Sequence, residues 1–433
     1  MATELLTTQT QNATSDPRDV EYWSRHCKPV LKSLLKSAGS YSEDEQEAQL
    51  RLLCDHVLPN LGPRPSRAPY PSFITQTGSP FQPQINISNN KPRIRYCWEP
   101  LGPRGGSESD PYGVEAAREI VSSLSKSFGF YSQWNDTFVD AFAPSPEQVR
   151  DVQEKLPKWL AKQMPPGVEP PLVRRLPFSF IAFELKDAKA SIKTYFNPKA
   201  KELATGIPAT EITWSALRNL KPSLNPASID AVAKFLAERE VPSAVELVGI
   251  DCVDEADLSE ARVKLYVHTR DNSFNTVRDY VTLGGRITDE TTLEGLGVLR
   301  ELWHMLLQKP EGIPDEGYDA PFSDKEGFAA YQKLYFGFEL RPSRELPEVK
   351  SYLPTWHYVK SDDVAVDNYE EVFRRCGQDW GHNSKYRKMF EEAFGPANHD
   401  RKVPVHCDAS FMYSKTKGAY QSLYYSPTLE IEA

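Results

Sequence analysis

Three segments of the chain place a cation and a tyrosine two residues apart, in sequence that favours strands. The pairs are Lys193 and Tyr195, Lys264 and Tyr266, and Lys350 and Tyr352. Because alternate residues of a strand lie on the same face, each segment directs a positive charge and an aromatic ring to one side. Burying such a face without an anion is unfavourable, so we expect the three segments to converge on an anionic ligand.

The two residue types suit two parts of one reaction. Lysine and arginine side chains bind phosphate oxygens, and arginine does so through two parallel hydrogen bonds. The face of a tyrosine ring attracts a cation through its quadrupole. An allylic diphosphate that ionises needs both, because ionisation produces a diphosphate anion and an allyl cation. The pairs therefore predict a site for an allylic diphosphate.

Composition excludes several other classes of protein. The net charge of −9 argues against a nucleic-acid partner. No apolar run is long enough to span a bilayer, and the start of the chain lacks the pattern of a secretory signal. The six cysteines form no C-x-x-C pair, which predicts reduced thiols in a cytoplasmic protein rather than a disulfide framework.

The hydrophobic pattern alternates between helices and strand pairs. Residues 1–19 are polar and are predicted to be disordered, and the unbroken rhythm of 20–433 predicts a single domain. Helical spacing covers 22–61, 112–128, 146–164, 229–240, 292–308 and 368–393. The strand pattern covers 81–98, 178–195, 244–252, 262–269, 336–340, 349–352, 410–413 and 419–425. About ten antiparallel strands with helices outside tend to close, so we expect a barrel.

Six short motifs follow one another along nearly the whole chain. They are Ile94–Pro100, Phe183–Lys186, Lys193–Pro198, Arg262–Tyr266, Lys350–Pro354 and Tyr420–Tyr424. In this order they resemble the fungal aromatic prenyltransferases of the dimethylallyltryptophan synthase type. The resemblance implies a ten-stranded antiparallel β-barrel surrounded by helices and built from ααββ repeats, which agrees with the pattern above.

The resemblance also implies a reaction and its residues. A dimethylallyl group would pass from dimethylallyl diphosphate to an aromatic carbon of a small-molecule acceptor, by Friedel–Crafts-like alkylation. The diphosphate would bind the cations Arg95, Lys193, Arg262, Lys264, Lys350 and Lys415. A shield around the allyl cation would consist of Tyr195, Tyr266, Tyr352 and Tyr424. Arg93 shares a face with Arg95, and Lys417 follows Lys415, but we assign the site to Arg95 and Lys415.

Some positions differ from the family pattern. Gln82 stands where the family usually has a glutamate that binds the indole N–H, and an amide is a very poor proton acceptor. The strand at 177–183 lacks the lysine of the indole-C4 enzymes, 244–250 lacks an arginine that reads the carboxylate of tryptophan, and Asn197 replaces a tyrosine. We predict that Gln82 orients an indole-containing metabolite other than free tryptophan.

Two alternatives and one absence complete the sequence-based prediction. A phenolic or quinone-type polyketide is an alternative acceptor, and a non-catalytic carrier of isoprenoid diphosphate is an alternative function. No metal or cofactor is expected, because Ser361–Asp367 lacks the D-D-x-x-D spacing and suits a helix cap. The histidines also lack metal-ligand spacing. The expected assembly is a monomer or homodimer.

Overall fold

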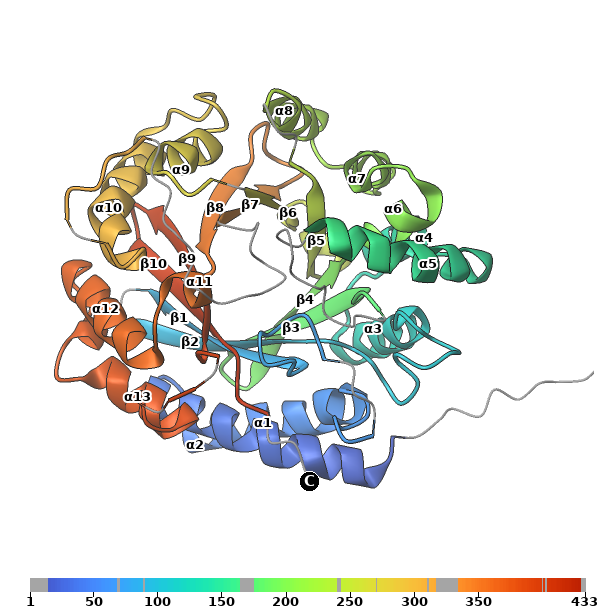
Figure 1. The fold of residues 1–433 in the computed structure, drawn as a ribbon, viewed down its shortest axis with the longest axis horizontal. Helices are drawn as coiled ribbons and strands as arrows, with labels where there is room; N and C mark the ends of the chain where they lie inside the picture. The colour runs from blue at the N-terminus through green and yellow to red at the C-terminus, as the bar shows by residue number, and fades with distance from the viewer. Residues whose placement is uncertain are drawn as a thin grey trace, which may run out of the picture.

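The structure, a computed structural model, describes residues 15–67, 71–88, 90–163, 175–239, 243–269, 271–309, 311–316, 334–398, 400–401 and 403–429. Ten strands form a closed barrel in which every neighbouring pair is antiparallel (Figure 1). They are β1 (Phe81–Ser88), β2 (Lys91–Trp98), β3 (Ser179–Lys186), β4 (Lys189–Phe196), β5 (Val245–Cys252), β6 (Val263–Thr269), β7 (Leu334–Leu340), β8 (Glu348–Leu353), β9 (His406–Ser414) and β10 (Gly418–Tyr425). The ten-stranded barrel predicted from the sequence is confirmed.

Helices surround the barrel on its outside (Figure 1). They are α1 (Pro17–Ala38), α2 (Glu43–Leu52), α3 (Val114–Phe128), α4 (Gln133–Phe142), α5 (Pro146–Gln163), α6 (Lys199–Thr205), α7 (Ala209–Arg218), α8 (Pro226–Ala237), α9 (Phe274–Val281), α10 (Glu290–Leu306), α11 (Thr355–Tyr358), α12 (Asp362–Arg375) and α13 (Lys385–Phe394). Short π or 3-10 turns are η1 (Leu53–Val57), η2 (Leu58–Asn60), η3 (Glu255–Asp257) and η4 (Asp379–Gly381). No helix in the described ranges is both long and apolar enough to cross a membrane.

The alternation of side chains along each strand determines which residues meet inside the barrel. On β2, Ile94, Tyr96 and Trp98 point outward and are fully buried against the surrounding helices. Arg95 occupies the opposite face and enters the interior. Because the side-chain period of a strand is two, the outward apolar positions fix the register of the inward polar ones.

The first and last strands of the chain are neighbours in the barrel. β1 pairs with β10, with Gln84 opposite Tyr424, and this pairing closes the barrel. Gln84 is also opposite Arg95 on β2. Residues separated by more than half of the sequence are therefore held side by side by main-chain hydrogen bonds.

Two predictions near the beginning of the chain require correction. The helical stretch predicted at 22–61 is divided into α1 and α2, because Gly39 ends α1 with a φ of 66°. Ser42 and Glu45 then form a capping box that starts α2. The short helices α4, α6, α7 and α9 lie outside the predicted helical ranges.

The disorder predicted for residues 1–19 falls partly outside the described residues, which begin at 15. It is wrong for 17–19, which form the first turn of α1. Asp19 is buried there and accepts a hydrogen bond from Arg64 Nη1 at 2.9 Å. An ion pair with a distant loop therefore holds a segment whose local polarity suggested disorder.

Candidate active site

A cavity of about 1400 Å³ occupies the barrel interior, and each of the ten strands contributes to its wall. The wall consists of three successive levels along the strands. On β4 these are Lys193 and Tyr195, followed by Asn197 just after the strand, and β6 repeats the order with a cation, a tyrosine and then a histidine. Positive charge therefore lies at one end of the cavity, aromatic rings lie in the middle and mixed polar groups lie at the other end.

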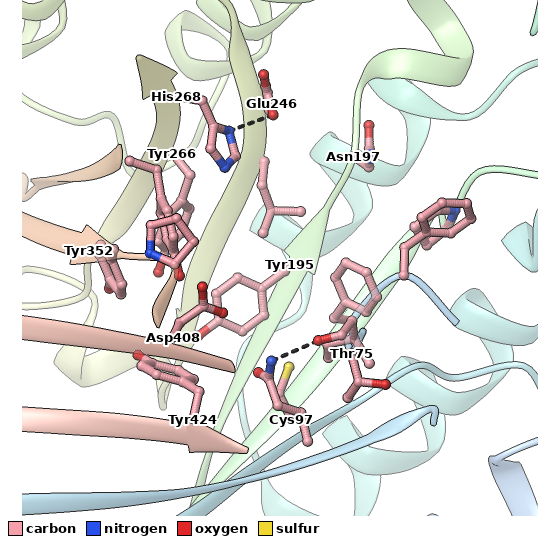
Figure 2. Close-up of a pocket in the computed structure, with 18 of the residues that line it drawn as sticks. Thr75, Cys97, Tyr195, Asn197, Glu246, Tyr266, His268, Tyr352, Asp408 and Tyr424 are labelled. Carbon is pink, nitrogen blue, oxygen red and sulfur yellow. Dashed lines mark hydrogen bonds and ion pairs between the residues drawn. The ribbon is translucent and has the colours of Figure 1, made fainter. Parts of the chain in front are cut away.

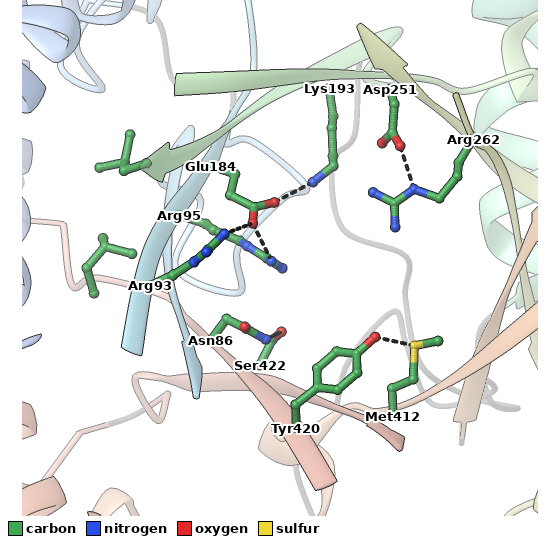
Figure 3. Close-up of polar contacts among 12 residues, drawn as sticks. Asn86, Arg93, Arg95, Glu184, Lys193, Asp251, Arg262, Met412, Tyr420 and Ser422 are labelled. Atoms are coloured by element: carbon green, nitrogen blue, oxygen red, sulfur yellow. Dashed lines mark hydrogen bonds and ion pairs between the residues drawn. The ribbon is translucent and has the colours of Figure 1, made fainter. Parts of the chain in front are cut away.

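Most cations at the first level are held by carboxylates that are buried or partly buried (Figure 3). Glu184 accepts hydrogen bonds from Arg95 Nη2 at 2.9 Å and from Lys193 Nζ at 2.8 Å. Lys264 Nζ lies 3.3 Å from Glu339 Oε1. The carboxylates separate like charges and keep the cations in place, which preorganises the positive end of the cavity.

The pKa values of these carboxylates show that the neighbouring cations outweigh the effect of burial. Burial raises the pKa of Glu184, but Arg95 and Lys193 lower it by more, and the net pKa is well below the usual range. Burial also raises the pKa of Glu339, but Lys264 and Arg262 lower it by more, so that it falls to about 2. Both groups are therefore anionic at neutral pH, so the paired lysines are held by full negative charges.

Lys350 differs from the other cations. It is 6% exposed and has no carboxylate within 4 Å among the described residues. Its ammonium lies over the rings of Tyr352 and Tyr420, at 5.3 and 5.6 Å from their centroids. Burial, followed by the charge of Arg95, lowers the pKa of Lys350 well below its usual value. An arriving anion would therefore stabilise the protonated form of this lysine.

Four tyrosine rings form the middle level of the cavity (Figure 2). The ring centroids are 6.1 Å apart between Tyr195 and Tyr266, 5.7 Å between Tyr266 and Tyr352, and 6.3 Å between Tyr352 and Tyr424. Burial raises the pKa of all four hydroxyls, so the rings are neutral at physiological pH. They form a continuous aromatic wall next to the cations.

Two glycines make room for this wall. Tyr195 lies opposite Gly249 on β5, and Tyr266 lies opposite Gly337 on β7. A Cβ at Gly249 would approach the Tyr195 ring to 2.8 Å, and one at Gly337 would lie 3.3 Å from the rings of Tyr266 and Tyr352. The tyrosines on β4, β6 and β8 therefore spread over the glycine positions of the strands between them.

The third level contains hydrogen-bonding groups of both kinds. Gln82 Nε2 donates to the main-chain oxygen of Ile74 at 2.7 Å. His268 Nδ1 lies 2.6 Å from Glu246 Oε2, and the His268 ring contacts Tyr335 at 5.0 Å between centroids (Figure 2). This end of the cavity can hold a neutral polar molecule next to the aromatic wall.

Nine of the eleven side chains predicted for the site line the cavity. They are Gln82, Arg95, Lys193, Tyr195, Lys264, Tyr266, Lys350, Tyr352 and Tyr424. Arg262 lies at the charged end of the barrel, outside the wall of the cavity, where it contacts Asp251 at 2.5 Å and Glu339 at 3.1 Å. Arg93 is more exposed than Arg95, with side chains 50% and 21% exposed, which agrees with the choice of Arg95.

The placement of Lys415 in the site is wrong. β9 ends at Ser414, and Lys415 lies in the following turn with 54% of its side chain exposed. It forms an ion pair with Glu290 at the start of α10, outside the barrel. The residue follows the strand by one position, so it does not share the inward face.

Sequence reasoning also missed several members of the site. Glu339, Asp251 and Glu184 hold the cations, Gly249 and Gly337 accommodate the rings, and Tyr335, His268 and Asp408 line the end of the cavity opposite the cations. Period-two alternation through the predicted strands would have placed most of them inward. Their partners depend on strand register, which the sequence alone does not give.

The aspartate-rich segment behaves as a helix cap, as predicted. Ser361 Oγ accepts a hydrogen bond from the Val364 N–H at the start of α12. Within the described ranges, no group of three or more histidine, cysteine, aspartate or glutamate side chains has the arrangement of a metal site. Arg95, Lys193, Lys264 and Lys350 at the first level could hold an anion.

Comparisons with known proteins agree with this geometry. The profile of the family described as tryptophan dimethylallyltransferase matches residues 19–389. An indole diterpene prenyltransferase, terF of Tolypocladium album, is 60% identical over 410 residues, covering 95% of this chain and 94% of that protein. The indole diterpene prenyltransferase ltmF of Epichloe festucae var. lolii is 48% identical over 414 residues, covering 96% and 94%.

A solved structure shows the same architecture. The crystal structure of AnaPT from Neosartorya fischeri superimposes with a TM-score of 0.77 and 25% sequence identity, covering 96% of each chain. Together with the family profile and the relatives at 60% and 48% identity, the barrel and its contents lead to one assignment. This chain is a member of the tryptophan dimethylallyltransferase family.

Proposed function

We propose that the protein transfers a dimethylallyl group from dimethylallyl diphosphate to an aromatic carbon of an indole-containing metabolite. The observation that carries this proposal is the contact between the first two levels of the cavity. Lys350 Nζ lies 5.3 Å from the centre of the Tyr352 ring, so a buried cation directly adjoins the aromatic wall. A diphosphate bound to the cations would hold its allyl group against the rings.

The chemistry follows from the position of each level. As the C–O bond of the donor breaks, negative charge grows on the diphosphate, and Arg95, Lys193, Lys264 and Lys350 stabilise it. The tyrosine faces stabilise the allyl cation and exclude the water that would capture it. The aromatic carbon of the acceptor attacks the cation, so the protein need not form a covalent intermediate.

The acceptor class is inferred from the third level and from the relatives. The two cations on this side of the cavity, Lys199 and Arg239, are already paired with Glu202 and Asp279. A substrate carboxylate would find no unpaired cation there within the described residues, and burying it would be costly. Two relatives are described as indole diterpene prenyltransferases, so we propose a neutral indole diterpene as the acceptor.

The acceptor proposal predicts a large difference between two substrates. The specificity constant for an indole diterpene should greatly exceed that for free L-tryptophan, measured with dimethylallyl diphosphate and product analysis by mass spectrometry. A phenolic polyketide in the same panel tests the alternative acceptor. Efficient prenylation of free tryptophan would contradict the proposed class, and donor binding without turnover of any aromatic acceptor would favour the carrier.

Gln82 should influence the position of attack within the same assay. Its Nε2 is held by Ile74, and its Oε1 is contacted only weakly, by Gln84 Nε2 at 3.4 Å. The amide oxygen can therefore accept the indole N–H. Gln82→Ala should lower the specificity constant by roughly threefold to tenfold, the effect of one hydrogen bond of about 0.5–1.5 kcal/mol, and should broaden the products. Unchanged rate and selectivity would exclude this role.

Turnover should not depend on a divalent metal. The cations that line the charged end of the cavity supply the positive charge that a diphosphate leaving group needs. Product formation in excess EDTA should therefore match the untreated rate, with added Mg²⁺ as the control. An absolute requirement for Mg²⁺ would show that the cations alone do not hold the diphosphate.

We also propose a cytoplasmic enzyme that acts as a monomer or homodimer. The six cysteines Cys27, Cys54, Cys97, Cys252, Cys376 and Cys407 are all free thiols. Free thiols are typical of proteins in a reducing compartment. Sedimentation of the purified protein would distinguish the two assemblies.

A further inference from the structure

Aromatic alkylation leaves a proton that must go to some group. The C–O bond of the donor breaks first and its electron pair leaves with the diphosphate; the aromatic ring then supplies the electron pair of the new bond to the allyl carbon. The alkylated ring then carries a positive charge, and it regains aromaticity when its C–H bond breaks and the electron pair returns to the ring. Gln82 cannot receive this proton, because a neutral amide is not a base at neutral pH.

Five carboxylates of the described residues line the cavity, and four of them have strong partners. Glu184 is held by Arg95 and Lys193, and Glu246 by His268. Asp279 is paired with Arg239. Asp271 accepts hydrogen bonds from the Ser273 N–H at 3.0 Å and from Thr276 Oγ1 at 2.6 Å, which fixes the start of α9.

Asp408 is the fifth carboxylate, and it differs from the other four. It projects from β9 into the same cavity as Tyr195, Tyr352 and Tyr424 (Figure 2). No lysine, arginine or histidine nitrogen lies within 4 Å of it in the described part of the chain. Its partners are weak proton donors, the Cys407 thiol at 2.9 Å and the hydroxyl of Tyr335. Its oxygens therefore have no cation in direct contact among the residues that the structure describes.

The register places Asp408 on the acceptor side of the aromatic wall. Ser410 lies opposite Tyr352 in the pairing of β8 with β9. Lys350 lies two residues from Tyr352, toward the charged end of the cavity. Because the strands are antiparallel, Asp408, two residues before Ser410, lies on the other side of Tyr352, away from the charged end. Cys407, the neighbour of Asp408, also receives the Gln82 Nε2 donor at 3.5 Å. Asp408 and Gln82 therefore belong to the same end of the cavity.

We propose that the Asp408 carboxylate accepts the proton that the alkylated aromatic ring loses. This inference rests on the proposed function and assigns a catalytic base to the acceptor side of the cavity. The proton moves from the ring carbon to a carboxylate oxygen of Asp408, and it passes to water when the product leaves. The diphosphate departs on the opposite side of the tyrosines, so leaving group and proton are separated.

The ionisation behaviour of Asp408 suits this role. Burial raises the pKa of Asp408 to about 6, and the groups that face it are Cys407, His268, Tyr335, Tyr369 and Tyr424. A base must be deprotonated before the reaction, so activity should rise with pH through about 6. A carboxylate whose pKa lies near the working pH is both ionised and basic enough to take a proton.

The test compares wild type with Asp408→Asn, which keeps the size of the side chain and an oxygen that can accept from Cys407. At saturating dimethylallyl diphosphate, kcat for the indole acceptor should fall by about 10²–10⁴-fold, the usual contribution of a general base. The limb of kcat/KM that falls below about pH 6 in the wild type should disappear. Asp408→Glu should recover part of the rate.

A second measurement separates proton transfer from a structural effect. With a ring-deuterated indole acceptor, Asp408→Asn should show a primary isotope effect that is small or absent in the wild type, because ring deprotonation becomes slow. Donor binding and the thermal unfolding midpoint should remain near wild type. Asp230→Asn removes an exposed carboxylate that is paired with Arg218 away from the cavity, and it should leave the rate, the pH profile and the isotope effect unchanged.

The outcomes are distinguishable from failure of the proposed function. If wild type prenylates the indole acceptor while Asp408→Asn retains its rate, pH profile and isotope effect, Asp408 is not the base. If Asp408→Asn loses activity without an isotope effect and with a lowered thermal unfolding midpoint, the role of Asp408 is structural and the inference is overturned. If wild type prenylates no indole acceptor, the proposed function itself fails.

Discussion

Replacing Lys264 with alanine is expected to lower kcat for the prenylated product by about two to three orders of magnitude, or about 2.7–4 kcal/mol. Lys264 is buried on β6, with its ammonium 3.3 Å from Glu339. The substitution removes a fixed positive charge from the end of the cavity where the leaving group develops its charge. It also leaves Glu339 with Arg262 as its remaining partner, at 3.1 Å. Steady-state kinetics at saturating acceptor would measure the loss.

Two further variants identify the cause. Lys415→Ala removes a lysine that the sequence also suggested, but this residue is exposed and paired with Glu290 outside the barrel, so wild-type kinetics are expected. Lys264→Ala combined with Glu339→Gln removes the carboxylate left behind. Partial recovery in the double variant would assign that part of the effect to Glu339. Wild-type rates for Lys264→Ala itself would mean that the donor does not bind at this end.

The second large effect concerns the fate of the allyl cation. Tyr266 contacts the rings of both Tyr195 and Tyr352, so it forms the centre of the aromatic wall. Tyr266→Ala opens a space that water can enter and removes a cation–π contact of about 0.5–2 kcal/mol. We expect the ratio of prenyl alcohol to prenylated product to rise by roughly tenfold, because 1.4 kcal/mol corresponds to one order of magnitude.

Chromatographic quantification of both products would measure this partition. Tyr266→Phe is the matched control, since it preserves the ring and should stay close to wild type. Binding of the donor should change little in Tyr266→Ala, because the cations remain. If the alanine variant weakened donor binding and left the ratio of the two products unchanged, Tyr266 would belong to the diphosphate site and not to the shield.

Much of this site could be predicted from the sequence because strand alternation is a local property. Lys193 and Tyr195 must share a face wherever β4 lies, and the same holds for Lys264 with Tyr266. Leu265, between Lys264 and Tyr266, is apolar and fully buried on the outward face, which leaves one choice for the inward face of β6. Lys415 failed because its assignment came from the family resemblance and not from alternation: the strand predicted at 410–413 already ended before it.

The remaining features depend on which strands are neighbours and in what register. Glu339 meets Lys264 because those two residues are opposite each other in the pairing of β6 with β7. The segment between these strands is long, so its sequence does not determine that register. The sequence alone indicates only that Gly249 weakens a strand. The structure shows that it makes room for the Tyr195 ring. The level of Asp408 relative to the tyrosines also follows from pairing, not from spacing.

The closure of the barrel by β1 and β10 has a consequence for how the protein is made. Tyr424 pairs beside Gln84, so one wall of the catalytic chamber is completed by a strand that leaves the ribosome long after the other. Until then the edges of β1 and β9 lack partners, and open edges invite association with other chains. Contacts this distant in sequence also slow folding. Nascent chains therefore expose the edges of β1 and β9 until β10 has been synthesised. The yield of folded protein in the cell should depend on chaperones that cover those edges.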